Sequence, residues 1–122
     1  MDSISQSLED YLEAVYMLIA DGTPAQVRDV AKTLSVKMPS VVKAIHELKR
    51  LGLVTQEPYA NIELTEKGRR MASHVLNRHM LLKSFLTKLG VDAETADRDA
   101  CLMEHILSPE TFEKIRIFTE RQ

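Results

Sequence analysis

The chain has 122 residues, 44% of them hydrophobic and 28% charged, and a formal net charge of −2. This composition is typical of one compact domain or two small modules, and four Gly and four Pro indicate long helices with few loops. One cysteine excludes an internal disulfide, no secretory signal pattern opens the sequence, and no apolar run is long enough to span a bilayer. We therefore expect a cytoplasmic protein that does not interact with membranes.

Three helices are predicted in the first part of the chain. An apolar stripe with helical spacing predicts a helix over residues 5–20, formed by Leu8, Leu12, Val15 and Ile19. A second, short helix ends near Ser35 and begins either at Thr23-Pro24 or after a short extended segment. The sequence KMPS places a proline in the first turn of a third helix, which ends at Gly52.

The hydrophobic period changes after this third helix. Residues 53–64 are predicted to form a β-hairpin of two short strands around the turn PYAN. Three further helices are predicted from their start and stop signals: Thr65 to Gly90, Asp92 to Leu107, and a last one from Ser108-Pro109 with Phe112, Ile115 and Phe118 or Thr119 along it. The predicted order is three helices, a hairpin and three helices.

This order indicates a winged helix-turn-helix, in which the third helix would enter the DNA major groove and the hairpin would be the wing. Its polar face carries Ser40, Lys43, His46 and Glu47, opposite the apolar Val41, Ile45 and Leu48. Lys43 has the chemistry to donate to guanine or to phosphate. A solvated face of a small helical domain would have the same composition, so the pattern alone leaves both interpretations open.

A second pattern involves residue types that bind metals. If residues 100–108 are helical, Cys101, Glu104 and His105 share one face. Farther from this segment, His79 lies within an apolar helical stripe, and Asp10 and Glu13 are one turn apart in the first helix. A buried structural cysteine, a hydrogen-bonded core histidine and acids that favour a helix N-terminus explain the same residues without a metal.

Several segments together resemble a known family. The sequences SLEDYLEAVYMLI, VRDVAKTLSVKMPSVVKAIHELKRLGLV, IELTEKG, RHMLLKSFL and ACLMEHILS are similar to the metal-dependent repressors of the diphtheria-toxin repressor and manganese transport regulator type. The resemblance implies a mainly α fold, with a winged-helix DNA-binding domain at residues 1–64 and a helical metal-binding and dimerisation domain at residues 65–122. It also implies a short form without the SH3-like domain of other members.

The resemblance further implies functional residues. The family's metal ligands fall on Asp10, Glu13, His79, Cys101, Glu104 and His105, and its DNA contacts on Lys37, Pro39, Ser40 and Lys43. Asp10 and Glu13 resemble the manganese branch, whereas Cys101 resembles the iron branch. Lys83 and Asp97 stand where the iron branch has ligands of a second metal site, so we expect that site to be missing.

The resulting prediction is a repressor of metal-uptake genes that binds a near-palindromic operator as a homodimer. Its cofactor would be Mn²⁺ or Fe²⁺, for which Co²⁺, Ni²⁺ or Zn²⁺ substitute, with no organic cofactor. The alternative is a winged-helix regulator that senses a small ligand or a thiol oxidant through Cys101. We expect no enzymatic activity, because the sequence has no nucleophile motif and no phosphate-binding loop.

Overall fold

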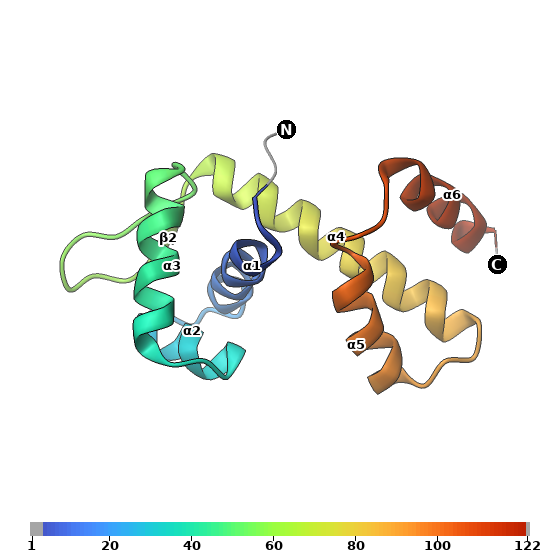
Figure 1. Ribbon diagram of the computed structural model, residues 1–122, viewed down its shortest axis with the longest axis horizontal. Coiled ribbons are helices and arrows are strands. Elements are labelled where there is room, and N and C mark those ends of the chain that lie inside the picture. Colours follow the sequence, from blue (N-terminus) through green and yellow to red (C-terminus); the bar gives the residue numbers. More distant parts are fainter. Residues whose placement is uncertain (1–3, 122) are drawn as a thin grey trace. The chain divides into compact units, whose positions relative to one another are not determined.

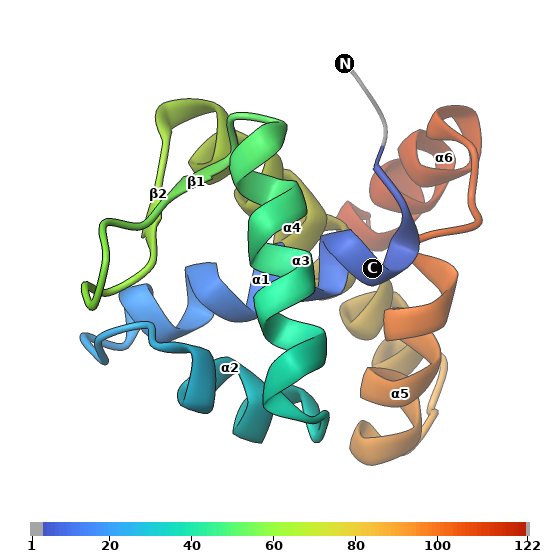
Figure 2. The ribbon, with the colours of Figure 1, turned by 60° about the vertical axis from the view of Figure 1, so that its left-hand side comes forward.

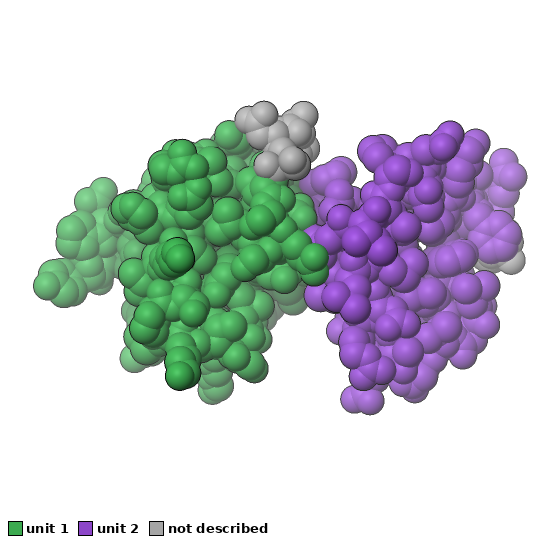
Figure 3. Space-filling view, in the orientation of Figure 1, with its two compact units in different colours: residues 1–73 green, residues 74–122 purple. Residues whose placement is uncertain are grey.

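The computed structural model describes residues 4–121 and contains six helices and one small sheet over that range (Figure 1). The chain divides into two compact units, Met1–Ser73 and His74–Gln122, which Figure 3 colours separately. The elements in order are α1 (Gln6–Ala20), α2 (Val27–Leu34), α3 (Met38–Arg50), β1 (Val54–Thr55), β2 (Glu63–Leu64), α4 (Glu66–Lys88), α5 (Ala93–Met103) and α6 (Pro109–Glu120). The predicted fold class and element order are confirmed.

The first unit has the helix-turn-helix arrangement. Ser35 ends α2 in a left-handed conformation with φ of 56°, and Lys37 is the N-cap of α3. Pro39 lies in the first turn of α3, as predicted, where its missing N–H removes no helical hydrogen bond. The core packs α1, α2 and α3 together through completely buried side chains, the largest of which are Leu12, Leu48 and Leu53.

The predicted hairpin is present as the wing, residues 53–64. β1 and β2 pair antiparallel with Val54 opposite Leu64, and their connecting loop projects from the unit (Figure 2). Tyr59 lies in this loop with φ of 62° and is completely exposed. The wing thus offers an exposed aromatic side chain on a loop that a short two-stranded sheet supports.

The start of α2 settles an alternative that the sequence left open. The helix begins at Val27, not at Thr23-Pro24, and Gln26 occupies the N-cap position. The amide of Ile62 donates to the carbonyl of Ala25 at 2.7 Å, so this segment bonds to the wing instead of starting a helix. The backbone amide of Gln26 donates to the Asp29 carboxylate at 3.2 Å, which satisfies a donor at the helix start.

The second unit holds the C-terminal part of α4 together with α5 and α6. Leu82, Ala100 and Phe112 are its buried centre, one from each helix. The predicted caps Asp92 and Ser108 are confirmed, because their side chains accept backbone amides at the starts of α5 and α6. Phe118 and Thr119 were alternative members of the apolar stripe of α6. Thr119 is the buried one, whereas Phe118 is 49% exposed.

The ends of the next two helices differ in outcome. The long helix α4 ends at Lys88, and Gly90 follows with φ of 100°, which agrees with the predicted stop, and Leu89 between them is 60% exposed. The next helix was expected to reach Leu107, but α5 ends at Met103. Amides after that point bond three residues back, as His105 N to Leu102 O at 3.3 Å does, which tightens the chain into a turn.

Candidate metal centre and DNA-binding surface

The four predicted DNA-contact residues lie on the exposed surface of the first unit. All are exposed at the start of α3 or just before it: Lys37, Pro39, Ser40 and Lys43. The opposite face of α3 is anchored in the core by Val41, Ile45 and Leu48, which are at most 2% exposed. The packing therefore turns this polar face outward, which is the requirement for a helix that enters a groove.

The basic residues at the other end of α3 are engaged within the unit. Lys49 Nζ donates to the carbonyl of Gln56 at 3.3 Å, which ties the helix to the wing. Arg50 pairs with Glu47, and this hydrogen bond holds the pKa of the Glu47 carboxyl below its ordinary value and raises that of Arg50. The surface around Lys37 and Lys43 is therefore the better candidate for phosphate or base contacts.

Two carboxylates of the predicted ligand set lie on α1. Asp10 and Glu13 are one helical turn apart and both are half-buried. Their neighbours Tyr11, Leu12 and Ala14 are buried in the core of the first unit, so the helix that carries the two acids is firmly held. Hard carboxylate oxygens on a rigid helix suit Mn²⁺ or Fe²⁺.

The remaining predicted ligands come together in the second unit around one buried carboxylate. Glu104 is 1% exposed. Its Oε2 lies 3.5 Å from Nδ1 of His79 on α4, and its Oε1 lies 3.5 Å from Nε2 of His105. The structure thus brings a carboxylate and two imidazoles together, although His79 lies on α4 and Glu104 follows α5.

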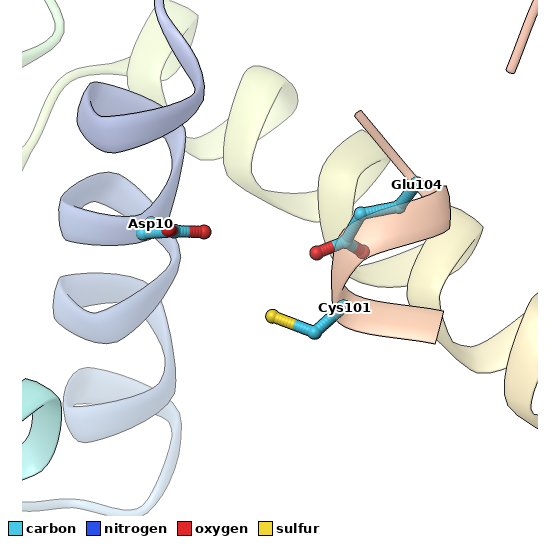
Figure 4. A group of neighbouring side chains, drawn as sticks. All are labelled: Asp10, Cys101 and Glu104. Atoms are coloured by element: carbon cyan, nitrogen blue, oxygen red, sulfur yellow. The ribbon is translucent and has the colours of Figure 1, made fainter. Parts of the chain in front are cut away.

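Cys101 and Glu104 lie one turn apart at the end of α5. Figure 4, which also labels Asp10 on α1, shows the thiol and the carboxylate projecting from the same side of α5. Cys101 is exposed, so it is not the buried structural cysteine that the alternative interpretation predicted. The predicted helix does not extend through all three residues, because only Cys101 lies within α5, whereas Glu104 is its C-cap and His105 follows in the turn.

The backbone of this turn is held by a residue that the sequence analysis did not identify. Arg78, next to His79 on α4, donates from its guanidinium to the carbonyl oxygen of Glu104. The same guanidinium lies 5.1 Å from the centre of the Phe112 ring on α6, within the range of a cation–π contact. Arg78 and His79 therefore both contact Glu104, one at its backbone and the other at its side chain.

The outer nitrogen of His79 has its own partner. Nε2 lies 2.9 Å from Oδ1 of Asp97 on α5, and Lys83 Nζ lies 3.5 Å from the same oxygen. The hydrogen bond with His79 is the largest cause that holds the pKa of the Asp97 carboxyl below its ordinary value. The sequence indicated Lys83 and Asp97 only as departures from a second metal site. It gave no signal for the contacts that Asp97 makes with Lys83 and with His79.

The donor atoms fit a divalent metal ion. Nδ1 of His79 is buried and makes no hydrogen bond within residues 4–121. A buried acceptor without a hydrogen bond is costly unless another ligand occupies its lone pair. Carboxylate, imidazole and thiol are all metal-ligand groups, and this nitrogen faces the buried carboxylate of Glu104.

Two family models match the chain. The model described as iron-dependent repressor, N-terminal DNA-binding domain, matches residues 3–62, and the model described as iron-dependent repressor, metal binding and dimerisation domain, matches residues 65–121. The chain belongs to the iron-dependent repressor family. Membership confirms, at the level of the family, the predicted metal-dependent repressor, its divalent metal cofactor, its DNA partner and its dimerisation.

Similar proteins agree with this membership. An HTH-type transcriptional regulator of Methanocaldococcus jannaschii is 43% identical over 120 residues, which cover 97% of this chain and 96% of the relative. The transcriptional regulator MntR of Escherichia coli is 37% identical over 114 residues, which cover 93% and 74%. The structure of the manganese regulator SloR is 28% identical with a TM-score of 0.83, and the match covers 94% of this chain but only 54% of that one.

The chain therefore spans about half the length of that solved structure. Within residues 4–121, no helix has the length and apolar character that crossing a membrane requires.

Proposed function

We propose that this repressor binds Mn²⁺ or Fe²⁺ and, in that form, binds a near-palindromic operator of metal-uptake genes as a homodimer. The observation that carries the proposal is the buried Glu104 carboxylate, which lies between the imidazoles of His79 and His105. The similarity to the manganese regulator SloR and the match to the iron-dependent repressor family support these two metals. We place this activity in the cytoplasm and propose no enzymatic step for it.

The proposal assigns roles to particular residues. The six metal ligands are Asp10, Glu13, His79, Cys101, Glu104 and His105, and the DNA contacts are Lys37, Pro39, Ser40 and Lys43. DNA binding belongs to residues 1–64, and metal binding and dimerisation belong to residues 65–122. A second metal ion at Lys83 and Asp97 is opposed by the ammonium of Lys83, which already pairs with the Asp97 carboxylate.

The chemistry of the ligand set suggests how metal controls DNA binding. A bound metal ion would exchange water ligands for the two carboxylates on α1 and for the ligand side chains on α4, on α5 and in the turn after α5. Because the proposed ligands belong to both units, those arrangements of the chain in which all ligands meet are favoured. A shift from about 1:99 to 99:1 in the active population requires roughly 10⁴-fold tighter metal binding by the active arrangement.

Titration of operator binding with single metals tests the proposal. Purified protein, kept anaerobic and reduced, would be titrated with Mn²⁺, Fe²⁺, Co²⁺ or Zn²⁺ while binding to promoter DNA is measured by fluorescence anisotropy. We expect DNA affinity to rise with Mn²⁺ or Fe²⁺ and to fall after chelation. DNA affinity that no metal and no chelator changes would rule the proposal out.

The alternative function is a winged-helix regulator that senses a thiol oxidant or a small ligand. The exposure of Cys101 favours it, because an accessible thiol can be oxidised. In that case chelation leaves DNA binding unchanged, whereas treatment with a mild oxidant changes it. The same anisotropy assay separates the two functions.

Lys43→Ala is expected to weaken operator binding without affecting the dimer or the metal. Lys43 is exposed on α3, and the loss of one base-edge contact costs about 1–3 kcal/mol. Anisotropy with operator and with random DNA measures the loss, and Lys114→Ala is the matched control because Lys114 is an exposed lysine on α6 in the other unit. Unchanged affinity for both DNAs would remove Lys43 from the interface.

Cys101 is expected to bind metal as a thiolate. The wild-type protein with Co²⁺ should therefore show an intense near-ultraviolet charge-transfer band that disappears in Cys101→Ser. Cys101→Glu should retain Mn²⁺ binding and lose preference for Co²⁺ and Zn²⁺, because a carboxylate oxygen is a harder ligand than sulfur. If the wild type lacks the band while Co²⁺ still activates DNA binding, Cys101 is not a ligand and the remaining five residues hold the ion.

A further inference from the structure

The two ring nitrogens of His79 have different surroundings. Nδ1 is buried, makes no hydrogen bond within the described chain and lies 3.5 Å from the Glu104 carboxylate. Nε2, at the other side of the ring, lies 2.9 Å from Oδ1 of Asp97. A carboxylate accepts hydrogen bonds and cannot donate them when ionised, so the contact with Asp97 requires the proton on Nε2. The lone pair of a neutral imidazole is then on Nδ1.

We propose that Asp97 is a positioning residue that fixes the tautomer and ring orientation of His79, so that Nδ1 can bind the metal ion. This inference rests on the proposed function, which places a metal ion beside His79. Histidines that bind metals commonly donate their other N–H to a carboxylate, and that contact orients the ring and raises its basicity as a ligand. Asp97 itself touches no metal in this proposal.

Lys83 completes the arrangement. It follows His79 by one helical turn on α4, and its ammonium lies 3.5 Å from the same Asp97 oxygen that contacts His79. Its side chain is 41% exposed, so the pair contributes little stability. Its ammonium contacts the Asp97 oxygen from α4 and so holds that oxygen beside Nε2 of His79. Lys83 and Asp97 thus support the first metal site in place of forming a second.

The two simplest substitutions of Asp97 should have effects in an unusual order. Asp97→Ala removes the acceptor and leaves Nε2 to water, which permits the required tautomer, so metal affinity should fall about 10-fold. Asp97→Asn introduces an amide N–H that can donate to Nε2 and thereby place the proton on Nδ1. The metal-facing nitrogen is then blocked, and affinity should fall about 100-fold. A role in packing or charge alone predicts that the closer mimic, Asn, is the milder change.

The experiment combines two measurements on the 122-residue protein. Long-range ¹H–¹⁵N NMR of the metal-free protein, in mildly alkaline buffer, reports which nitrogen of His79 carries the proton. Titration with Mn²⁺ alone, followed by electron paramagnetic resonance of the free ion, gives the affinity. Asp99→Asn is the matched control, because Asp99 is an exposed carboxylate on the same helix.

We expect the Nε2–H tautomer in the wild type and in Asp99→Asn, the Nδ1–H tautomer in Asp97→Asn, and affinities in the order wild type, Asp97→Ala, Asp97→Asn. Wild-type Mn²⁺ affinity in Asp97→Asn, or a weaker affinity in Asp97→Ala than in Asp97→Asn, would overturn the inference. If the wild type shows the expected tautomer but binds neither Mn²⁺ nor, under anaerobic conditions, Fe²⁺, the proposed function fails, and the positioning role falls with it. The metal-free NMR result therefore distinguishes a wrong tautomer from a wrong function.

Discussion

Glu104→Gln is expected to abolish metal-dependent stabilisation while the metal-free protein still folds. Glutamine keeps the shape of the buried side chain but removes the charge that lies between His79 and His105. Loss of a group that only hydrogen-bonds to a metal ligand already lowers metal affinity roughly 10- to 100-fold, so loss of a ligand itself should lower it about 100-fold or more. A variant that lacks a metal ligand should lose the stability gained from metal but keep the stability of the metal-free protein.

Thermal or urea unfolding with and without Mn²⁺ measures this contrast. At a metal concentration about 100 times its dissociation constant, the wild type gains about 2.7 kcal/mol, whereas a variant that binds 100-fold more weakly gains about 0.4 kcal/mol. Glu94→Gln is the control, an exposed carboxylate in the first turn of the same helix. Equal metal-induced shifts in the wild type and Glu104→Gln would show that Glu104 is not a ligand.

The parts of the fold that local chemistry determines could be predicted from the sequence. Thr65, Asp92 and Ser108 cap their helices as expected, because a short polar side chain before a helix bonds to amides only two or three residues away. The wing was predictable for the same reason, since the change to period two and the turn residues are local signals. Elements of this kind carry their own evidence in a few consecutive residues.

Features that depend on distant contacts could not be predicted. The sequence left two starts of α2 open, and the choice of Val27 depends on the hydrogen bond between Ala25 and Ile62, a residue of the wing. The end of α5 moved to Met103, and no glycine marks that position. Spacing alone grouped Cys101, Glu104 and His105, but it gave no indication that Glu104 and His105 would lie beyond the last residue of α5.

In the candidate site, too, the sequence indicated the ligands but not the residues that hold them in place. The residue types and their spacing indicated metal ligands, and the family resemblance supplied the set. The contact of His79 with Asp97 joins α4 to α5, and that of Arg78 with the Glu104 carbonyl joins α4 to the turn after α5. Neither contact has a periodic signal in the sequence, because each depends on how two helices pack. The residues that position the ligands therefore emerged only from the structure.

Gly68→Ala is expected to destabilise the DNA-binding unit, although alanine is the better helix former. Gly68 lies in the first turns of α4, and a Cβ there would be 1.9 Å from the carbonyl oxygen of Leu53. That oxygen accepts the amide of Thr65 at 3.1 Å, and Leu53 itself is completely buried, so neither can move away easily. The gain of about 1 kcal/mol in helix propensity is therefore smaller than the cost of the clash.

We expect a net loss of about 2–3 kcal/mol, which for a unit of this size corresponds to a fall in melting temperature of roughly 10–20 °C. Circular dichroism during heating measures it, and Arg70→Ala is the control, because Arg70 is exposed on the same helix and its ion pair with Glu66 is worth little. The junction at Leu53 connects α3, the wing and α4, so operator affinity should fall at temperatures where the variant is still folded. A Gly68→Ala protein as stable as the wild type would mean that the wing can shift away from α4 without cost.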